Sequence, residues 1–590
     1  MKLSQALALV QQRRDIGSRR KIFLACGFQP LHLVTFLQGH FAQRFEQDAA
    51  DIQVGAYGDL AGTLAAAAES QAEAGAVIIE WSDLDPRLGC RSSGGWGPSV
   101  EHEIVANCRE RVAQLLSRLE HLASTIPLAL ALPSLPVPLF GHTNGGQLGL
   151  AEAELEELGA ALAVAAARLA NVRIVRSSRL DRLSPPGGRF DANMELAAGF
   201  PYGLAHASTL AQQLIGLLYP SNPMKGLITD LDNTLWAGIV GEVGASAVGW
   251  GLAEHAQLHG LYQQQLKQFS EMGVLLAVSS KNDAAVAESA LSRPDLYVPA
   301  SAFFPVIANW QPKSMAVAEI LKAWNIGAES VTYVDDSPME LEEVKTAFPL
   351  MTCLRFPNSS PAKGLELLEQ LRDLFGKPAL ASEDALRHES IRANMRFRET
   401  AAQTSPNEFL AQLRSKLTFD IQKDPSNKRL LELINKTNQF NLNGTRISEG
   451  EWLRFLTNPL SFVIGVSYED KFGPLGVIAV IAGRRSDNQL DVSTWVMSCR
   501  AFSRNIELHI LKYLFASTNF ETIRFAFRAT ERNTPMQTFI NTQCPAQGSS
   551  DECTIVRTDF LRRHNELPDM VVVAGEHALV GLADDRVGGE

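Results

Sequence analysis

LITDLDNTLWAGIVG, residues 227–241, sets the interpretation of the whole 590-residue chain. The apolar Leu227 and Ile228 predict the end of a buried parallel strand. Asp230 and Asp232 follow one residue apart, so both side chains leave the strand on one side, toward the crevice where open α/β sheets bind ligands. Two carboxylates this close repel unless a cation lies between them or one is protonated. The pair therefore predicts an oxygen-liganded divalent ion, Mg²⁺ first.

An isolated Asp-x-Asp is more often a polar turn after a strand, so the downstream sequence decides between a turn and a site. Three downstream segments carry further polar residues beside an apolar run: LLAVSSKND (275–283) with Ser280, NWQPKS (309–314) with Lys313, and VTYVDDSPMEL (331–341) with Asp335 and Asp336. Roles that cluster in this way are a stronger indication of a site than any one motif.

These segments resemble, in order, the motifs of the haloacid dehalogenase (HAD) superfamily, whose nucleophile motif is DxDxT. The sequences of these motifs are similar to those of the FkbH-like branch of that superfamily: DLDNTLWAGIVGE, SSKND, NWQPKS and YVDDSPMELEEV. The resemblance implies a Rossmann-like HAD phosphatase core over residues 223–378, with a minimal cap. It also implies handling of a glyceryl unit from 1,3-bisphosphoglycerate, which is loaded on an acyl carrier protein in polyketide or related pathways.

The resemblance further implies a role for each polar residue. Asp230 would be the nucleophile, and Asp232 the general acid and then the base. Ser280 would donate a hydrogen bond to the phosphoryl group, and Lys313 would supply a positive charge. Mg²⁺ would be bound by Asp230, the backbone carbonyl of Asp232 and Asp336. Asp335 would be either a second ligand or a supporting acid.

Ser279 departs from related sequences, which often carry a cysteine before SKN as a carrier of the glyceryl group. A serine ester is the alternative, but serine needs a base that a thiolate does not. Ser279 is therefore a weaker candidate acyl carrier, while the prediction of phosphate removal is unaffected.

Residues 1–222 alternate apolar strands with amphipathic runs, which predicts a doubly wound parallel sheet. The expected strands are KIFLACG (21–27), AVIIEW (76–81), PLALALP (127–133) and NVRIV (171–175). This part resembles the degenerate SGNH-hydrolase-like domain of FkbH-like proteins. Cys26 stands at the place of the SGNH nucleophile, and Gly203 replaces the aspartate that would orient His206. Cys26 could hold an acyl group, alone or with His206; we favour a small buried hydrophobe.

Residues 379–590 begin with a predicted linker helix over 383–403. After it, the order of helix, strands and helix resembles a GNAT acyltransferase, and also the C-terminal part of FkbH-like proteins. In RAFSRN (500–505), Ser503 and Asn505 fill the glycine positions of the GNAT pyrophosphate loop, which hinders close approach of a pyrophosphate. Arg500 and Arg504 could still hold phosphates. Asn438 is a candidate for binding a pantetheine arm, although a backbone-capping amide is the favoured interpretation.

The composition excludes several classes of protein. A net charge of −11 indicates no general affinity for nucleic acid. Seven scattered cysteines without a CxxC pair predict a reducing compartment, with neither a structural zinc nor a disulfide framework. No apolar run is long enough for a membrane span, and the N-terminus predicts a surface helix, not a signal peptide. The expected location is the cytoplasm.

Three functions remain open on the sequence. The first is an FkbH-like, Mg²⁺-dependent phosphatase and acyl-loading protein that acts on a phosphorylated three-carbon acid and an acyl carrier protein. The second is a GNAT-type acyltransferase in glycan or natural-product tailoring. The third is a non-catalytic scaffold for a carrier protein. The acid pairs Asp230/Asp232 and Asp335/Asp336 disfavour the third, and Ser503 and Asn505 disfavour the second.

Overall fold

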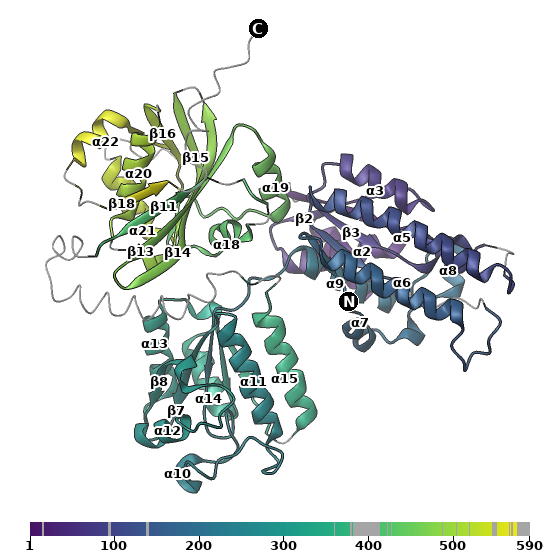
Figure 1. The fold of residues 1–590 in the computed structure, drawn as a ribbon, viewed down its shortest axis with the longest axis horizontal. Helices are drawn as coiled ribbons and strands as arrows, with labels where there is room; N and C mark the ends of the chain where they lie inside the picture. Colours follow the sequence, from purple (N-terminus) through teal and green to yellow (C-terminus); the bar gives the residue numbers. More distant parts are fainter. Residues whose placement is uncertain are drawn as a thin grey trace. The chain divides into compact units, whose positions relative to one another are not determined.

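A computed structural model describes the chain over residues 1–14, 17–92, 96–136, 141–358, 360–377, 380, 413–421, 423–425, 427–486, 488–502, 504–518, 520–544, 552–565, 567 and 570–574 (Figure 1). It contains two compact units, Met1–Ser221 with Ile447–Pro459 and Asn222–Arg446 with Leu460–Glu590. Two five-stranded sheets and one eight-stranded sheet form their frames. The linker helix predicted over 383–403 and the loop residue Ser503 lie outside the described residues. The predicted division at residues 222 and 378 into three domains stays a prediction.

The first unit is built on a parallel sheet of order β2-β1-β3-β4-β5. Its strands are β1 (Arg19–Ala25), β2 (Ala49–Val54), β3 (Ala74–Ile78), β4 (Leu128–Ala131) and β5 (Val172–Ile174). The predicted parallel sheet in this part of the chain is confirmed, and β2 is a strand that the sequence pattern did not predict.

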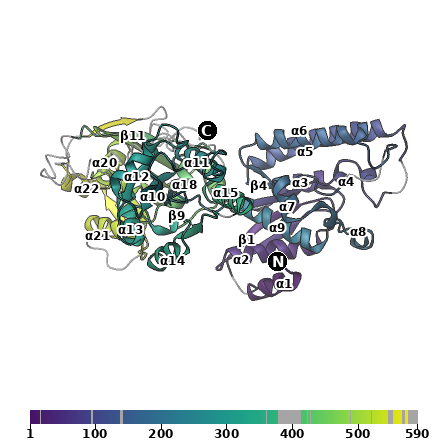
Figure 2. The same ribbon diagram turned by 90° about the horizontal axis from the view of Figure 1, so that it is seen from below.

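Both faces of this sheet are covered by helices, because successive strand residues point to opposite faces. Ile22 and Leu24 pack with α1 (Leu3–Gln12), α2 (Leu31–Arg44) and α9 (Leu204–Leu218). Phe23 and Ala25 pack with α3 (Leu60–Glu69), α5 (Glu101–Ala123) and α6 (Leu150–Ala167). Figure 2 shows α5 and α6 on one side of the unit and α1 and α2 on the other. The same unit also contains the shorter helices α4 (Trp81–Leu84), α7 (Ser177–Leu183) and α8 (Ala192–Ala198).

Helix α19 (Glu449–Thr457) belongs to the first unit although it lies far along the chain. Arg173 Nη2 donates to both carboxylate oxygens of Glu449, at 2.5 and 2.6 Å. Arg20 pairs with Glu451 at 3.1 Å. A Cβ at Gly450 would lie 2.1 Å from the carbonyl oxygen of Glu73, so only glycine allows this close approach.

The second unit contains a parallel sheet of order β10-β9-β6-β7-β8. Its strands are β6 (Gly226–Thr229), β7 (Leu275–Ser280), β8 (Phe303–Ala308), β9 (Val331–Asp335) and β10 (Thr352–Arg355). Leu227 and Leu276 pack with α11 (Gln257–Glu271), α12 (Ala284–Leu291) and α15 (Pro361–Phe375). Ile228 and Tyr333 pack with α13 (Lys313–Trp324) and α14 (Pro338–Ala347). Since β6 lies between β7 and β9, the carboxyl ends of these three strands are neighbours.

The remaining sheet of the second unit is mixed, with the order β17-β16-β15-β14-β13-β11-β18 and β12 beside β15. Its strands are β11 (Lys416–Asp420), β12 (Phe440–Asn441), β13 (Ser461–Asp470), β14 (Gly473–Ser486), β15 (Gln489–Met497), β16 (Thr522–Ala526), β17 (Glu552–Val556) and β18 (Val571–Ala574). Its helices are α18 (Lys428–Lys436), α20 (Ile506–Ser517), α21 (Thr534–Gln543) and α22 (Arg557–Arg563). The apolar segments FVIGV and GVIAVIAG lie in β13 and β14, which pair antiparallel.

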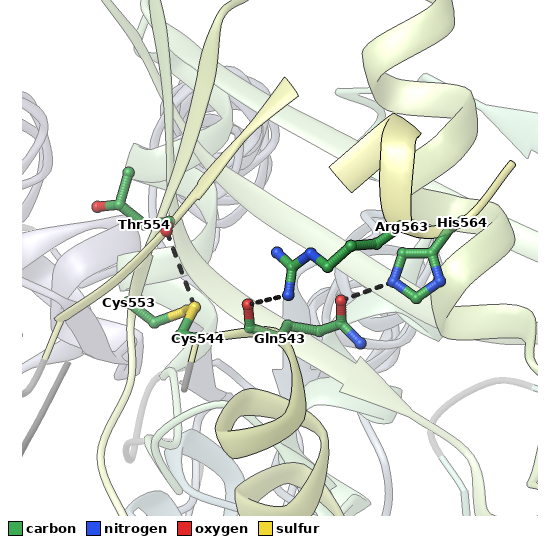
Figure 3. Close-up of a disulfide and its surroundings, with 6 residues drawn as sticks. All are labelled: Gln543, Cys544, Cys553, Thr554, Arg563 and His564. Carbon is green, nitrogen blue, oxygen red and sulfur yellow. Dashed lines mark hydrogen bonds between the residues drawn. A yellow bond between two sulfur atoms is a disulfide. The ribbon is translucent and has the colours of Figure 1, made fainter. Parts of the chain in front are cut away.

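A disulfide joins Cys544, after α21, to Cys553 in β17 (Figure 3). The same region is tied to α22 by Arg563 Nη1, which donates to the carbonyl oxygen of Gln543 at 3.1 Å, and by a 2.9 Å bond between His564 Nε2 and Gln543 Oε1. The sequence predicted a reducing compartment and no disulfide framework, and it did not anticipate this disulfide. Within the described ranges, no helix is both long and apolar enough to cross a membrane.

Candidate functional site

The polar residues singled out in the sequence come together at the carboxyl ends of β6, β7 and β9. Asp230 directly follows β6, and its backbone N–H donates to Val334 O of β9 at 3.0 Å, which continues the ladder to the strand end. Ser280 and Asp335 are the last residues of β7 and β9. The chain turns away after Asp230 through Asn233, whose positive φ of 56° is one that asparagine tolerates.

Lys313, the first residue of α13, lies at the centre of this site. Its Nζ donates to Asp230 Oδ1 at 2.6 Å, to the carbonyl oxygen of Ser279 at 2.7 Å and to Asp335 Oδ2 at 3.2 Å. Glu340 Oε2 is also 3.2 Å away. Only 2% of the Lys313 side chain is exposed, so its charge is stabilised by these carboxylates and not by water.

Three carboxylates meet beside the ammonium. Asp230, Asp335 and Asp336 each present an oxygen within 4.8 Å of the others. The Tyr333 hydroxyl donates to Asp335 Oδ2 at 2.5 Å, and Asn358 Nδ2 donates to Asp336 Oδ2 at 3.0 Å. The three residues predicted to present metal-binding carboxylates at two strand ends are therefore neighbours in the structure.

The electrostatics of this cluster fit a bound cation. Burial raises the pKa of Asp230 to about 7; the neighbouring Asp335 adds to this and Lys313 opposes it. Burial likewise raises the pKa of Asp335, and burial together with Asp335 raises that of Asp336. A positive charge beside these acids offsets the cost of ionising them, as Lys313 does for Asp230 and Asp335, and a bound cation would offset more of it. An all-oxygen set of carboxylates is the donor set that Mg²⁺ prefers.

The carboxylate of Asp232 lies outside this cluster and is held by three N–H donors. Trp236 Nε1 and the Val240 backbone donate to Oδ1 at 2.9 and 3.0 Å. Asn282 Nδ2 donates to Oδ2 at 2.9 Å. The part predicted for Asp232 in metal binding involves its backbone carbonyl and stays a prediction, as does its role as general acid.

Ser280 and Ser279 end β7 in different surroundings. Ser280 Oγ accepts a 3.0 Å hydrogen bond from Asn282 Nδ2. Ser279 is fully buried, and its hydroxyl has no hydrogen-bond partner among the described residues. The structure thus gives the candidate acyl carrier Ser279 neither solvent access nor a base.

Cys26 and His206, the other residues proposed for acyl chemistry, have separate partners in the first unit. The Cys26 thiol is buried and donates to Phe28 O at 3.4 Å, and burial, followed by the nearby Asp83, raises its pKa. His206 bonds Ser134 Oγ through Nε2 at 3.1 Å and Ser184 Oγ through Nδ1 at 3.0 Å. Burial lowers the pKa of His206 to about 3. These surroundings suit a thiol that stays protonated and an imidazole that stays neutral.

The candidate phosphate-binding residues of the mixed sheet make internal contacts. Arg504 is almost fully buried; its Nε lies 3.3 Å from Asp470 Oδ2, and its guanidinium lies 5.4 Å from the centre of the Tyr468 ring. Arg500 Nε donates to Ser498 Oγ at 3.4 Å. Asn438 Oδ1 accepts from Arg446 Nη2. The buried ion pair commits Arg504 to the interior of the sheet.

Two residues that hold the site together escaped the sequence analysis. Glu340 bridges Lys313 and Lys281, whose Nζ is 3.0 Å from Glu340 Oε1. Asn282 joins Asp232 to Ser280. Their positions in the sequence could have identified both residues. Glu340 lies in the first turn of α14, just after the acids, and Asn282 lies two residues after Ser280.

No family model and no curated protein sequence matches this chain. Among solved structures, it is similar to the N-terminal part of the protein BF1531 from Bacteroides fragilis, which contains a phosphatase domain and is complexed with Mg. That likeness has 17% identity and a TM-score of 0.49, and covers 64% of this chain and 100% of the other. An uncharacterized protein from Corynebacterium glutamicum is similar at 15% identity and a TM-score of 0.19, over 26% of this chain and 98% of the other. Both likenesses are too distant to indicate fold or activity. The proposed activity therefore rests on the geometry of the site.

Proposed function

We propose that this chain is an Mg²⁺-dependent phosphatase of the haloacid dehalogenase type, acting at the carboxyl ends of β6, β7 and β9. One observation carries the proposal: a buried ammonium, Lys313, bonds two buried aspartates beside a third carboxylate. Clustered acids with raised pKa values and one fixed cation are typical of a functional site. The DxDxT resemblance around Asp230 supports the choice of phosphoryl transfer.

The acids Asp230, Asp335 and Asp336 would hold the metal. Mg²⁺, when bound, supplies charge neutralisation to phosphoryl oxygens during transfer.

The residues of the chain then divide the reaction into two steps. In the first, a carboxylate oxygen of Asp230 bonds to phosphorus, the bond from phosphorus to the leaving oxygen breaks, and Asp232 gives that oxygen a proton. Lys313 and the Ser280 hydroxyl stabilise charge on the phosphoryl oxygens. In the second step, Asp232 takes a proton from water, the water oxygen bonds to phosphorus, and Asp230 is released with inorganic phosphate.

Release of inorganic phosphate from p-nitrophenyl phosphate tests this proposal directly. We expect turnover with Mg²⁺, none with EDTA, and loss of activity in Asp230→Asn. Asp373→Asn, an exposed change of the same kind on α15, is the matched control and should behave as the unchanged protein. Activity that survives Asp230→Asn would refute the assignment of the nucleophile.

We extend the proposal to the substrate and its acceptor. The FkbH-like wording of the four motifs favours a phosphorylated three-carbon acid, with the glyceryl unit passing to the phosphopantetheine arm of an acyl carrier protein. Only α10 (Val240–Val243) and α11 separate β6 from β7, so the described chain has no large cap there to exclude a bulky acceptor. The same resemblance favours an SGNH-like domain in residues 1–222 and a GNAT-like domain in residues 379–590.

Weighing the carrier protein by mass spectrometry tests this extension. Incubation with Mg²⁺ and 1,3-bisphosphoglycerate should add one glyceryl unit, and Asp230→Asn should abolish the gain. Ser279→Ala and Cys26→Ala, tested separately, show whether either residue holds the acyl group. Turnover of acetyl-CoA with an amine or sugar acceptor would instead favour the GNAT-type activity, which the internal ion pair of Arg504 disfavours.

A further inference from the structure

Asn282 is a buried residue that the proposed mechanism does not use, and it touches two residues that the mechanism does. It follows β7 by two positions and is 4% exposed. Its Nδ2 lies 2.9 Å from Asp232 Oδ2 and 3.0 Å from Ser280 Oγ. An ionised carboxylate only accepts hydrogen bonds, so the amide nitrogen must face Asp232. Both amide hydrogens are then donated, one to each partner.

This arrangement distinguishes the two oxygens of Asp232. Oδ1 already accepts from Trp236 Nε1 and from the Val240 backbone N–H, whereas Oδ2 accepts, among the residues that the structure describes, only from Asn282. A carboxylate oxygen has about two lone-pair sites, so Oδ2 is the oxygen with room for a proton. The amide bond fixes where that oxygen, and a proton on it, can point.

The second amide hydrogen has a matching effect on Ser280. A hydroxyl group can donate one hydrogen bond through its O–H and accept two through the lone pairs of its oxygen. Because Ser280 Oγ accepts from Asn282 Nδ2, its own O–H remains available as a donor to another group. One amide thereby directs a proton-carrying oxygen and a hydroxyl donor at the same end of the sheet.

We propose that Asn282 is the positioning residue of the reaction, which aims Asp232 Oδ2 at the leaving oxygen and the Ser280 hydroxyl at a phosphoryl oxygen. This inference rests on the proposed function. In the step concerned, the phosphorus-to-leaving-oxygen bond breaks as the Asp230-to-phosphorus bond forms. The proton moves from Asp232 Oδ2 to the departing oxygen, and nothing is oxidised or reduced.

A purely structural amide and a positioning amide differ in how the substrate's leaving group matters. A poor leaving group, such as an alkoxide, needs the proton from Asp232, whereas p-nitrophenolate leaves without it. Loss of aim at Asp232 should therefore lower kcat for alkyl phosphates selectively. A misplaced Ser280 hydroxyl should affect both kinds of substrate to the same extent, because that hydroxyl contacts the phosphoryl group they share.

The test compares Asn282→Ala and the similarly shaped Asn282→Asp on glycerol phosphate and p-nitrophenyl phosphate with saturating Mg²⁺. We expect kcat for glycerol phosphate to fall on the order of 10- to 100-fold, part of the roughly 10²–10⁴-fold that acid–base catalysis supplies. The fall for p-nitrophenyl phosphate should be about 3-fold or less, because little of that contribution is needed there. Ser292→Ala, an exposed change at the end of α12, is the control and should change neither.

A double-variant cycle separates positioning from general loosening of the site. If Asn282 acts through Asp232, adding Asn282→Ala to Asp232→Asn should lower kcat for glycerol phosphate by no more than about 2-fold, since residues that act as one unit are not additive. The inference would be overturned by an equal fold loss of kcat on both substrates, by no loss of kcat, or by a fully additive loss of kcat in the double variant. The phosphatase assignment would stand in each case. Failure of the unchanged protein to hydrolyse either ester would overturn both.

Discussion

Replacing Lys313 by methionine removes a buried cation that contacts Asp230, Asp335 and Glu340, at 2.6, 3.2 and 3.2 Å. Methionine is of similar length and apolar, so the packing of α13 changes little while the carboxylates lose their partner. Breaking a buried ion pair from one side costs about 3–5 kcal/mol. We expect the parallel sheet that carries the site to lose stability by this amount.

The size of the effect should depend on pH with a definite sign. Burial raises the pKa of Asp230 to about 7, above the ordinary aspartate value, and also raises that of Asp335. Groups whose pKa is raised by folding favour the folded state below their ordinary pKa, and this contribution is lost as pH rises through the folded value. The variant should therefore be more impaired at pH 8.5 than at pH 6, where protons replace part of the missing charge.

Hydrogen exchange monitored by mass spectrometry measures the loss locally, which suits a chain of two units. Peptides over β6 and β9 should exchange on the order of 10²- to 10⁴-fold faster in Lys313→Met at pH 8.5, since about 1.4 kcal/mol corresponds to a factor of ten. Mg²⁺ at about 100 times its Kd should restore about 2.7 kcal/mol.

Lys322→Met is the matched control, because Lys322 is an exposed lysine in the last turn of the same helix. It should change stability by less than about 1 kcal/mol. Equal exchange in the two variants, or a Lys313→Met protein that is indifferent to both pH and Mg²⁺, would refute the electrostatic account of the site.

Three further predictions concern parts of the chain away from this site. In His206→Gln, the free energy of unfolding of the first unit should depend less on pH between pH 3 and 6.5, by about 1.4 kcal/mol per pH unit, the effect of one proton. The pKa of His206, about 3, makes the unchanged protein lose stability as the pH falls through that window. The same pH dependence in urea titrations of both proteins would contradict this. Gly450→Ala should destabilise the first unit by about 1–3 kcal/mol through contact with Glu73, whereas Gly216→Ala in α9, where an added Cβ meets nothing within 4 Å, should be neutral or stabilising in the same thermal melts. Alkylation of the denatured, unreduced protein should label five of the seven cysteines, as expected for one disulfide, and a mass showing seven labels would contradict the bond.

The parallel sheets were predictable because their strands are short apolar runs separated by helical ones. β2 was missed for a physical reason. It is an edge strand that contains Asp51, and its residues 51–54 are partly buried or exposed, so its sequence lacks a continuous apolar run. The disulfide was missed because Cys544 ends a helix and Cys553 lies in a strand, and the core that packs α21 with β17 forms only in the folded chain.

The site was predictable where its residues end strands, because the sheet order brings those ends together. Asp230, Ser280 and Asp335 belong to this class. Glu340 and Asn282 were not predictable in the same way, since their contacts with Lys313 and Asp232 depend on how a helix and a loop pack against the strand ends. Burial is equally hidden from the sequence: Arg504 could have been a surface phosphate ligand, and its pairing with Asp470 is a property of the folded sheet.

The place of α19 has a consequence for attempts to separate the two units. The polypeptide leaves the second unit at Ile447, supplies a helix to the first, and returns at Leu460, so a protease that cuts only near residue 222 cannot liberate a complete N-terminal fragment. A fragment ending there would leave Arg173 without Glu449 and would uncover the surface on which Gly450 rests. Co-expression of the two halves, with the later one providing this helix in trans, should rescue solubility where the first half alone precipitates.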